Sequence, residues 1–221
     1  QYFPIEEPDG STNAANLVAG GNVGTLVNYV ASSPWTNSGL AGKLTGSSSA
    51  LVMNGVANYA NIGNIGLTAP LSISMWIKPS SAFTNADSVL FGQLSGPNSG
   101  VDIHIGSVRL TKGGGLVARG ASLDVTPSGT IQPDKWTHLA FVYQDGMKTY
   151  VNGTNLVFTS TNGCTFNTDP FGLGAPLWAL TAPVYQSFPG QMDDVSIWSG
   201  ALSPENVQDL ANGTTPTAIG G

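Results

Sequence analysis

The stretch from Phe188 to Leu210, FPGQMDDVSIWSGALSPENVQDL, predicts a β-strand that is followed by a short helix. Two adjacent acids come after a glycine turn, and apolar residues then alternate through Val195 and Ile197, as they do in a strand with one buried face. Ser203 is a suitable N-cap, and Pro204 suits the first helical position. The apolar residues of this helix could close it onto the preceding strand.

Two blocks further upstream predict more strands. The block WTHLAFVY, Trp136 to Tyr143, is followed by an Asp-Gly turn, by the strand residues up to Val151 and by an Asn-Gly turn. Asp-Gly and Asn-Gly supply the positive φ angles that tight hairpin turns need. The block LSISMWIKP, Leu71 to Pro79, alternates, with its isoleucines and methionine on one face and its serines and tryptophan on the other.

The composition favours a single large β core. The 221 residues include 29 Gly and 14 Pro, spread along the chain as in proteins with many turns between short strands. Only 9% of the residues are charged, against about 25% in an average soluble protein, and the net charge is −6. This balance argues against binding to nucleic acid or to an anionic membrane. No run of about 18 apolar residues exists, so no membrane insertion is expected.

The three blocks together resemble the concanavalin A-like lectin/glucanase superfamily, in the laminin-G-like jelly-roll branch found in secreted bacterial proteins. Their order and spacing match from Tyr2 to Leu210. The resemblance implies an all-β, two-sheet antiparallel jelly-roll sandwich with one short C-terminal helix, whose first strand, near Tyr2–Glu7, lies close to the last. We expect a single domain over residues 1–211, then a flexible Thr/Gly-rich tail over 212–221, in a secreted or cell-surface protein.

Hydrolases with this fold carry paired carboxylates in an E-x-D-x-E or E-x-D-x-x-E strand. This chain has only three Glu, and none of them lies in such a pattern. Asp102 and His104 are the best acid–base pair because residues i and i+2 share a strand face, but an ordinary hydrogen-bonded or exposed pair is the simpler interpretation. His138 shares a face with apolar residues and is expected in a packed sheet position. The expectation is that the chain is not an enzyme.

The resemblance also implies a structural calcium ion, because it places Asp193 at the family's main metal-binding acid and Asp194 at the second. Calcium prefers carboxylate and carbonyl oxygens. Alternation puts Asp193 on the face of Val195 and Ile197, where a carboxylate is costly unless it is paired or bound to metal. The family's partner loop contains an Asp, whereas NLVAGGN, residues 16–22, does not. The alternative is that backbone N–H groups or a lysine hold Asp193.

Three aromatic residues in loop-like surroundings are the predicted ligand-binding residues: Trp35, Trp178 and Tyr185. A sugar ring stacks its apolar face on an exposed aromatic, and nearby polar groups bind its hydroxyls. Each of the three could instead anchor a loop. The tryptophans of the strand motifs, such as Trp198, are assigned to packing.

The sequence therefore predicts a non-catalytic secreted or surface domain that binds a polysaccharide or other glycan in a lectin-like manner. The alternative is a self-associating structural, surface-layer or adhesion protein with the same fold, supported by the low charge, which weakens repulsion between copies. A glycoside hydrolase comes third.

Overall fold

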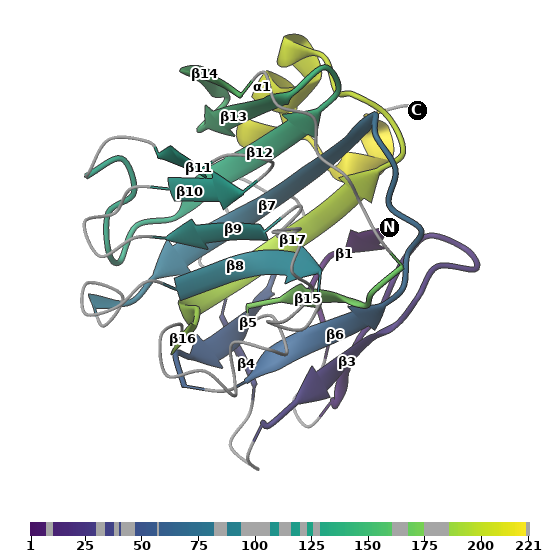
Figure 1. Ribbon diagram of the computed structural model, residues 1–221. Coiled ribbons are helices and arrows are strands. Elements are labelled where there is room, and N and C mark those ends of the chain that lie inside the picture. The colour runs from purple at the N-terminus through teal and green to yellow at the C-terminus, as the bar shows by residue number, and fades with distance from the viewer. Residues whose placement is uncertain are drawn as a thin grey trace, which may run out of the picture.

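The computed structural model describes residues 1–7, 11–29, 34–37, 40, 47–56, 58–81, 88–93, 107–110, 116–119, 123–125, 129–160, 168–174 and 186–219. In these residues two β-sheets pack face to face, and one α-helix lies at the C-terminal end (Figure 1). The all-β, two-sheet jelly-roll sandwich predicted from the sequence is confirmed. No helix in the described part of the chain is long and apolar enough to cross a membrane.

The first sheet contains the three blocks that decide the fold prediction. Its strands, all antiparallel, run in the order β14 (Thr154–Ser160), β13 (Met147–Val151), β12 (Thr137–Tyr143), β7 (Leu71–Pro79), β17 (Pro189–Trp198), β5 (Ser49–Asn54) and β4 (Trp35–Asn37), and β1 (Tyr2–Phe3) also pairs with β17. The strand of the opening stretch, β17, thus lies in the middle of this sheet.

The second sheet covers one face of the first. Its order is β11 (Leu123–Val125), β10 (Leu116–Arg119), β9 (Ser107–Leu110), β8 (Ser88–Gln93), β15 (Phe171–Leu173), β6 (Tyr59–Gly63), β3 (Gly24–Val27) and β2 (Asn13–Ala14). These pairs are antiparallel, whereas β16 (Gln186–Ser187) runs parallel to β8.

The main core fills the space between the sheets. Ile73, Met75 and Ile77 of β7 are fully buried in it, as their alternation predicts. Phe91 of β8 meets Phe141 of β12 edge to face, with 5.2 Å between ring centroids, so aromatic packing joins the two layers.

The other face of the first sheet is covered by α1 (Pro204–Ala211), drawn in yellow beside β12–β14 in Figure 1. The predicted cap is confirmed, since the Ser203 side chain accepts a hydrogen bond from the Asn206 N–H. Val207 packs with Val142 and Tyr150 of β12 and β13. The helix therefore closes onto the hairpin strands rather than onto the strand that precedes it.

The structure shortens the predicted first strand. β1 pairs with β17 as expected, with Tyr2 opposite Ser196, but it ends at Phe3 instead of continuing to Glu7. Ile5 has a φ of 62°, which is incompatible with an extended strand.

The segment after α1 packs against the sandwich instead of forming a free tail. The N–H of Thr214 donates to the Asp209 carbonyl, and a 3₁₀-helix (η3, Pro216–Ala218) follows. Pro216 and Ile219 are buried. Apolar contacts of these two side chains outweigh the Thr/Gly-rich composition that favours a flexible tail.

Candidate functional site

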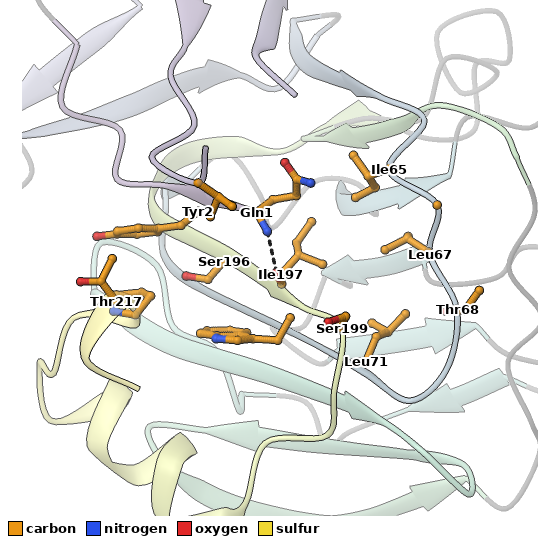
Figure 2. Close-up of a pocket in the computed structure, with 14 residues that line it drawn as sticks. Gln1, Tyr2, Ile65, Leu67, Thr68, Leu71, Ser196, Ile197, Ser199 and Thr217 are labelled. Carbon is orange, nitrogen blue, oxygen red and sulfur yellow. Dashed lines mark hydrogen bonds between the residues drawn. The ribbon is translucent and has the colours of Figure 1, made fainter. Parts of the chain in front are cut away.

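A pocket of about 370 Å³ opens where the two ends of the described chain meet the end of β17 (Figure 2). Its walls come from β1, from the segment before β7, from the end of β17 and from η3. The lining residues are Gln1, Tyr2, Val18, Ile65, Gly66, Leu67, Thr68, Leu71, Ser196, Ile197, Trp198, Ser199, Pro216 and Thr217. Its volume lies at the lower end of the roughly 300–1,000 Å³ that small-molecule sites occupy.

The pairing of β1 with β17 holds this pocket together. The Gln1 nitrogen donates to the Ile197 carbonyl, and the Ile197 N–H donates to the Gln1 carbonyl, both at 2.8 Å. The Gln1 side chain in turn accepts a hydrogen bond from the Asn22 N–H at 3.0 Å. These bonds fix one wall of the pocket to the strand that forms its floor.

Two aromatic residues line the pocket. Tyr2 is buried, and its hydroxyl donates to Oδ1 of Asp194 at 2.5 Å. Trp198, at the end of β17, is only partly buried. The sequence assigned Trp198 to sheet packing because it ends a strand motif. The signal that could have placed it at a surface was its position directly before the Ser199-Gly200 turn, where a strand leaves the core.

The side chains around the pocket fall into two groups (Figure 2). Ile65, Leu67 and Leu71 give one side an aliphatic lining, whereas hydroxyl groups of Tyr2, Ser196 and Thr217 gather on the other. The exposed Thr68 and Ser199 add hydroxyls at the rim. The pocket therefore offers an apolar surface, an aromatic ring and several neutral hydrogen-bonding groups together.

Of the predicted stacking residues, the structure describes Trp35, which does not line the pocket. Trp35 is 5% exposed, belongs to the main core and donates its indole N–H to the Ser11 carbonyl at 3.4 Å. Its proposed role as an exposed platform is wrong, because β4 pairs with β5 and turns the ring inward. Trp178 and Tyr185 lie outside the described residues, as do Asp102 and His104.

Asp193 and Asp194 sit at a β-bulge in β17. Asp193 is opposite Trp76 and Ser196 is opposite Ser74, so β17 has one more residue than β7 across this interval. Within this bulge the backbone of Asp194 has a φ of 45°. Because opposite residues share a face, Asp193 lies on the face of Trp76 and not, as simple alternation predicts, on the core face with Val195.

Protein groups bind both carboxylates. Asp193 is fully buried and accepts hydrogen bonds from the Asp194 N–H at 2.8 Å and from the Ser47 hydroxyl at 3.0 Å. Asp194 accepts the Tyr2 hydroxyl. The pKa of Asp194 is raised to about 6, chiefly by burial; the Tyr2 hydrogen bond opposes this rise, and the nearby Glu6 adds to it. Burial, followed by the charge of Asp194, raises the pKa of Tyr2.

Calcium binding at Asp193 and Asp194 stays a prediction from the family resemblance. A calcium ion takes six to eight oxygen ligands, and a carboxylate oxygen that accepts one hydrogen bond keeps a second lone pair. Here hydrogen-bond donors point at both oxygens of Asp193. Across the described part of the chain, no three His, Cys, Asp or Glu side chains are grouped to hold a metal ion. Of the donors named in the alternative from the sequence, a backbone N–H, that of Asp194, binds Asp193, and the Ser47 hydroxyl is a further donor.

His138 occupies the packed sheet position that the sequence predicts. It is 1% exposed, lies opposite Trp76 with ring centroids 5.3 Å apart, and forms a 2.8 Å hydrogen bond from Nε2 to the Ser74 hydroxyl. The cavity beside the pair, which Leu210 and Pro216 of the C-terminal segment also line, has a volume of only about 10 Å³. A substrate has no access to it in this conformation.

Solved structures with a similar fold include two proteins that act on carbohydrate. The chain aligns over 95% of its length with 96% of domain 4 of an extracellular GH43 arabinanase from Geobacillus stearothermophilus, solved in complex with arabinotriose, at 22% identity and a TM-score of 0.62. It also aligns over 96% of its length with a sialidase from Trypanosoma rangeli, in complex with sialic acid, at 16% identity and a TM-score of 0.68. The chain spans only 33% of that sialidase.

Sequence comparison gives the family. A search of curated proteins finds no match. A laminin-G-type family model, described as the concanavalin A-like lectin/glucanases superfamily, matches residues 54–208, which include β7, the β12–β13 hairpin and β17. By the fold and by this match, the chain belongs to the concanavalin A-like lectin/glucanase superfamily.

Proposed function

We propose that this chain is a non-catalytic carbohydrate-binding domain of a secreted or cell-surface protein, and that the pocket beside Trp198 is its sugar site. The observation that carries the proposal is the combination in one pocket of a partly exposed indole and neutral hydroxyl side chains. A sugar presents an apolar C–H face and a ring of hydroxyls, so its recognition needs both kinds of group.

The similar structures support this choice of ligand class. The arabinanase domain, which matches the chain almost from end to end, was solved with a bound arabinose oligomer and is described as part of an extracellular enzyme. That protein's identity to this chain is low, so the pocket itself, and not the likeness, supports the placement of the site.

The arrangement of carboxylates supports a binding role without catalysis. Glycoside hydrolysis needs two carboxyl groups on either side of the scissile bond. Among the described residues that line the pocket, none is Asp or Glu. Glu6 accepts hydrogen bonds from the Ser48 and Ser49 N–H groups, and Glu7 accepts one from the Ala15 N–H. We expect no release of reducing sugar from polysaccharides, and release that Asp102→Asn abolishes would overturn this part of the proposal.

The test of the proposal is a glycan-array screen followed by titration of the best ligand into the Trp198→Ala variant. Shallow sugar sites bind in the millimolar to micromolar range, roughly −4 to −8 kcal/mol. We expect the variant to lose at least about tenfold in affinity, since one stacked ring contributes on the order of 1 kcal/mol or more.

Trp136→Ala is the matched control. Trp136 is also a partly buried tryptophan, but it packs beside Leu40 and Trp76, away from the pocket. Full binding by the Trp198 variant would refute the placement of the site. Loss of binding in Trp178→Ala or Tyr185→Ala alone would move the site to those residues.

A further inference from the structure

The pocket carries no charged side chain among the described residues that line it. The carboxylate of Asp194 lies behind Tyr2, at 2.5 Å from the Tyr2 hydroxyl. The whole chain carries a net charge of −6. A carboxylated sugar would therefore lose part of its hydration without meeting a cationic side chain, and it would enter a region of negative potential. The N-terminal nitrogen of Gln1, which also lines the pocket, already donates to the Ile197 carbonyl. These features favour an uncharged ligand.

The aliphatic side of the pocket restricts the ligand further. Ile65, Leu67 and Leu71 offer no hydrogen-bonding group in their side chains (Figure 2). Val18, which is 46% exposed, is a further apolar residue of the lining. A sugar hydroxyl turned toward this side would give up its bonds to water without replacement. A methyl or acetyl group in the same place would instead bury apolar surface.

The opposite side is suited to hydroxyl groups. The Tyr2 hydroxyl already donates its hydrogen to Asp194, so its oxygen is left to accept a hydrogen bond from a ligand. The exposed Thr217 hydroxyl shares a 3.3 Å hydrogen bond with the Thr215 hydroxyl and keeps at least one lone pair that can accept from a ligand. One side of the ligand should therefore be rich in hydroxyls and the other side apolar.

We infer that the pocket selects an uncharged sugar that carries an apolar substituent, such as the methyl group of a deoxy sugar or the methyl of an acetyl group. The substituent lies against Ile65, Leu67 and Leu71, and the ring hydroxyls face Tyr2 and Thr217. This inference rests on the proposed function and specifies the ligand class of the same site.

The experiment compares sugars that differ only in the substituent. Methyl glycosides of galactose and fucose, of mannose and rhamnose (each pair in one absolute configuration), and of glucose and N-acetylglucosamine are titrated into the full chain by ligand-observed NMR, with methyl glucuronoside as the charged probe. In at least one pair, we expect the substituted sugar to bind about tenfold or more tightly than its parent, the size of effect that one buried methyl group produces. The glucuronoside should bind more weakly than the glucoside.

Two isosteric variants test the aliphatic side without disturbing the core. Val18→Thr replaces a methyl group with a hydroxyl at the pocket wall, and it should reduce the preference for the substituted sugar severalfold. Val23→Thr makes the same change in the same loop, at a residue that is 53% exposed and outside the pocket, and it should leave the preference unchanged.

The outcomes separate this inference from the proposed function. The inference is overturned if every parent sugar binds as tightly as its substituted partner or more tightly, or if the glucuronoside binds more tightly than the glucoside. If Trp198→Ala abolishes binding in that case, the proposed site still stands. If no sugar binds, or if Trp198→Ala has no effect on binding, the proposed function fails and the inference fails with it.

Discussion

At the scale of single residues, Asp194 is a buried carboxylate in a backbone conformation that few side chains adopt. Its φ of 45° lies in the left-handed region, where Asp and Asn are the non-glycine residues found most often. Burial raises its pKa to about 6, so the folded protein binds a proton at this site more tightly than the unfolded chain does. Between about pH 4 and pH 6 the free energy of unfolding should therefore fall as the pH rises.

Asp194→Asn should remove this pH dependence. Asn tolerates the positive φ, carries no charge to desolvate, and presents an oxygen that can accept the Tyr2 hydroxyl. The difference between a pKa of about 6 and the ordinary 3.8 limits the gain in the free energy of unfolding at pH 8 to about 3 kcal/mol. Denaturant titrations at pH 4 and pH 8 measure the effect, with Asp194→Ala as the control that loses the hydrogen bond. A variant that is less stable than wild type at pH 8 would show that the charge itself is needed.

Asp193 should behave differently, because both its oxygens already have protein donors. We expect Asp193→Ala to lower the free energy of unfolding by roughly 2–4 kcal/mol, since it leaves the Ser47 hydroxyl and the Asp194 N–H without this acceptor in a buried place. A chelator should leave the melting temperature of ion-stripped wild type unchanged. If a chelator instead lowered the melting temperature of the wild type, if added calcium reversed this change, and if the Asp193→Ala variant showed no such change, the metal site implied by the family resemblance would be established.

At the scale of secondary-structure elements, the described helix depends on a local cap. The Ser203 side chain accepts from the Asn206 N–H, and the Asn206 side chain accepts from the Ser203 N–H, which together form a capping box. Ser203→Ala should therefore cost about 1 kcal/mol of stability, and Ser203→Asp should retain most of it. Thr215→Ala is the matched control, because Thr215 occupies the same position before η3 but makes no capping bond. Equal losses in the two alanine variants would show that the cap does not stabilise the fold.

The elements that the sequence predicted well are those that local patterns define. Alternation alone located β7, turn residues located the β12–β13 hairpin, and the Ser203-Pro204 pair located the start of α1. The misplaced features depend on contacts between distant segments. The bulge at Asp194 shifts the faces of β17 through its pairing with β7, and the burial of Trp35 follows from the pairing of β4 with β5.

The candidate site could not be predicted from the sequence for a related reason. Its walls come from residues 1–2, 18, 65–68, 71, 196–199 and 216–217, which only the closed sandwich brings together. The sequence pointed to the kind of side chain that the proposed site uses, an aromatic beside hydroxyls, but it assigned Trp198 to packing and the tail to solvent. The polar residues of the pocket follow no motif that sequence spacing could reveal.

At the scale of the whole molecule, the loop of residues 17–23 distinguishes the sugar-binding hypothesis from the self-association hypothesis. Leu17, Val18 and Val23 are 61%, 46% and 53% exposed and stand close together along residues 17–23. A self-associating protein could bury such a surface against another copy, particularly when few charges oppose the contact. Val18 also lines the pocket, so association through this loop would cover the sugar site.

Sugar binding and self-association therefore predict different molecular masses for the protein in solution. For a sugar-binding domain we expect sedimentation velocity to show a 22.7 kDa monomer from micromolar to millimolar concentration, with or without ligand. The net charge of −6 keeps copies apart, and three exposed side chains bury too little area for a stable dimer, which needs about 1,000 Å² or more. A dimer that Leu17→Ser dissociates would favour self-association, and Val56→Ser is the control because Val56 is 72% exposed in the turn after β5 and lies outside the pocket. If the bound sugar also dissociated that dimer, the loop would be an interface that competes with the pocket.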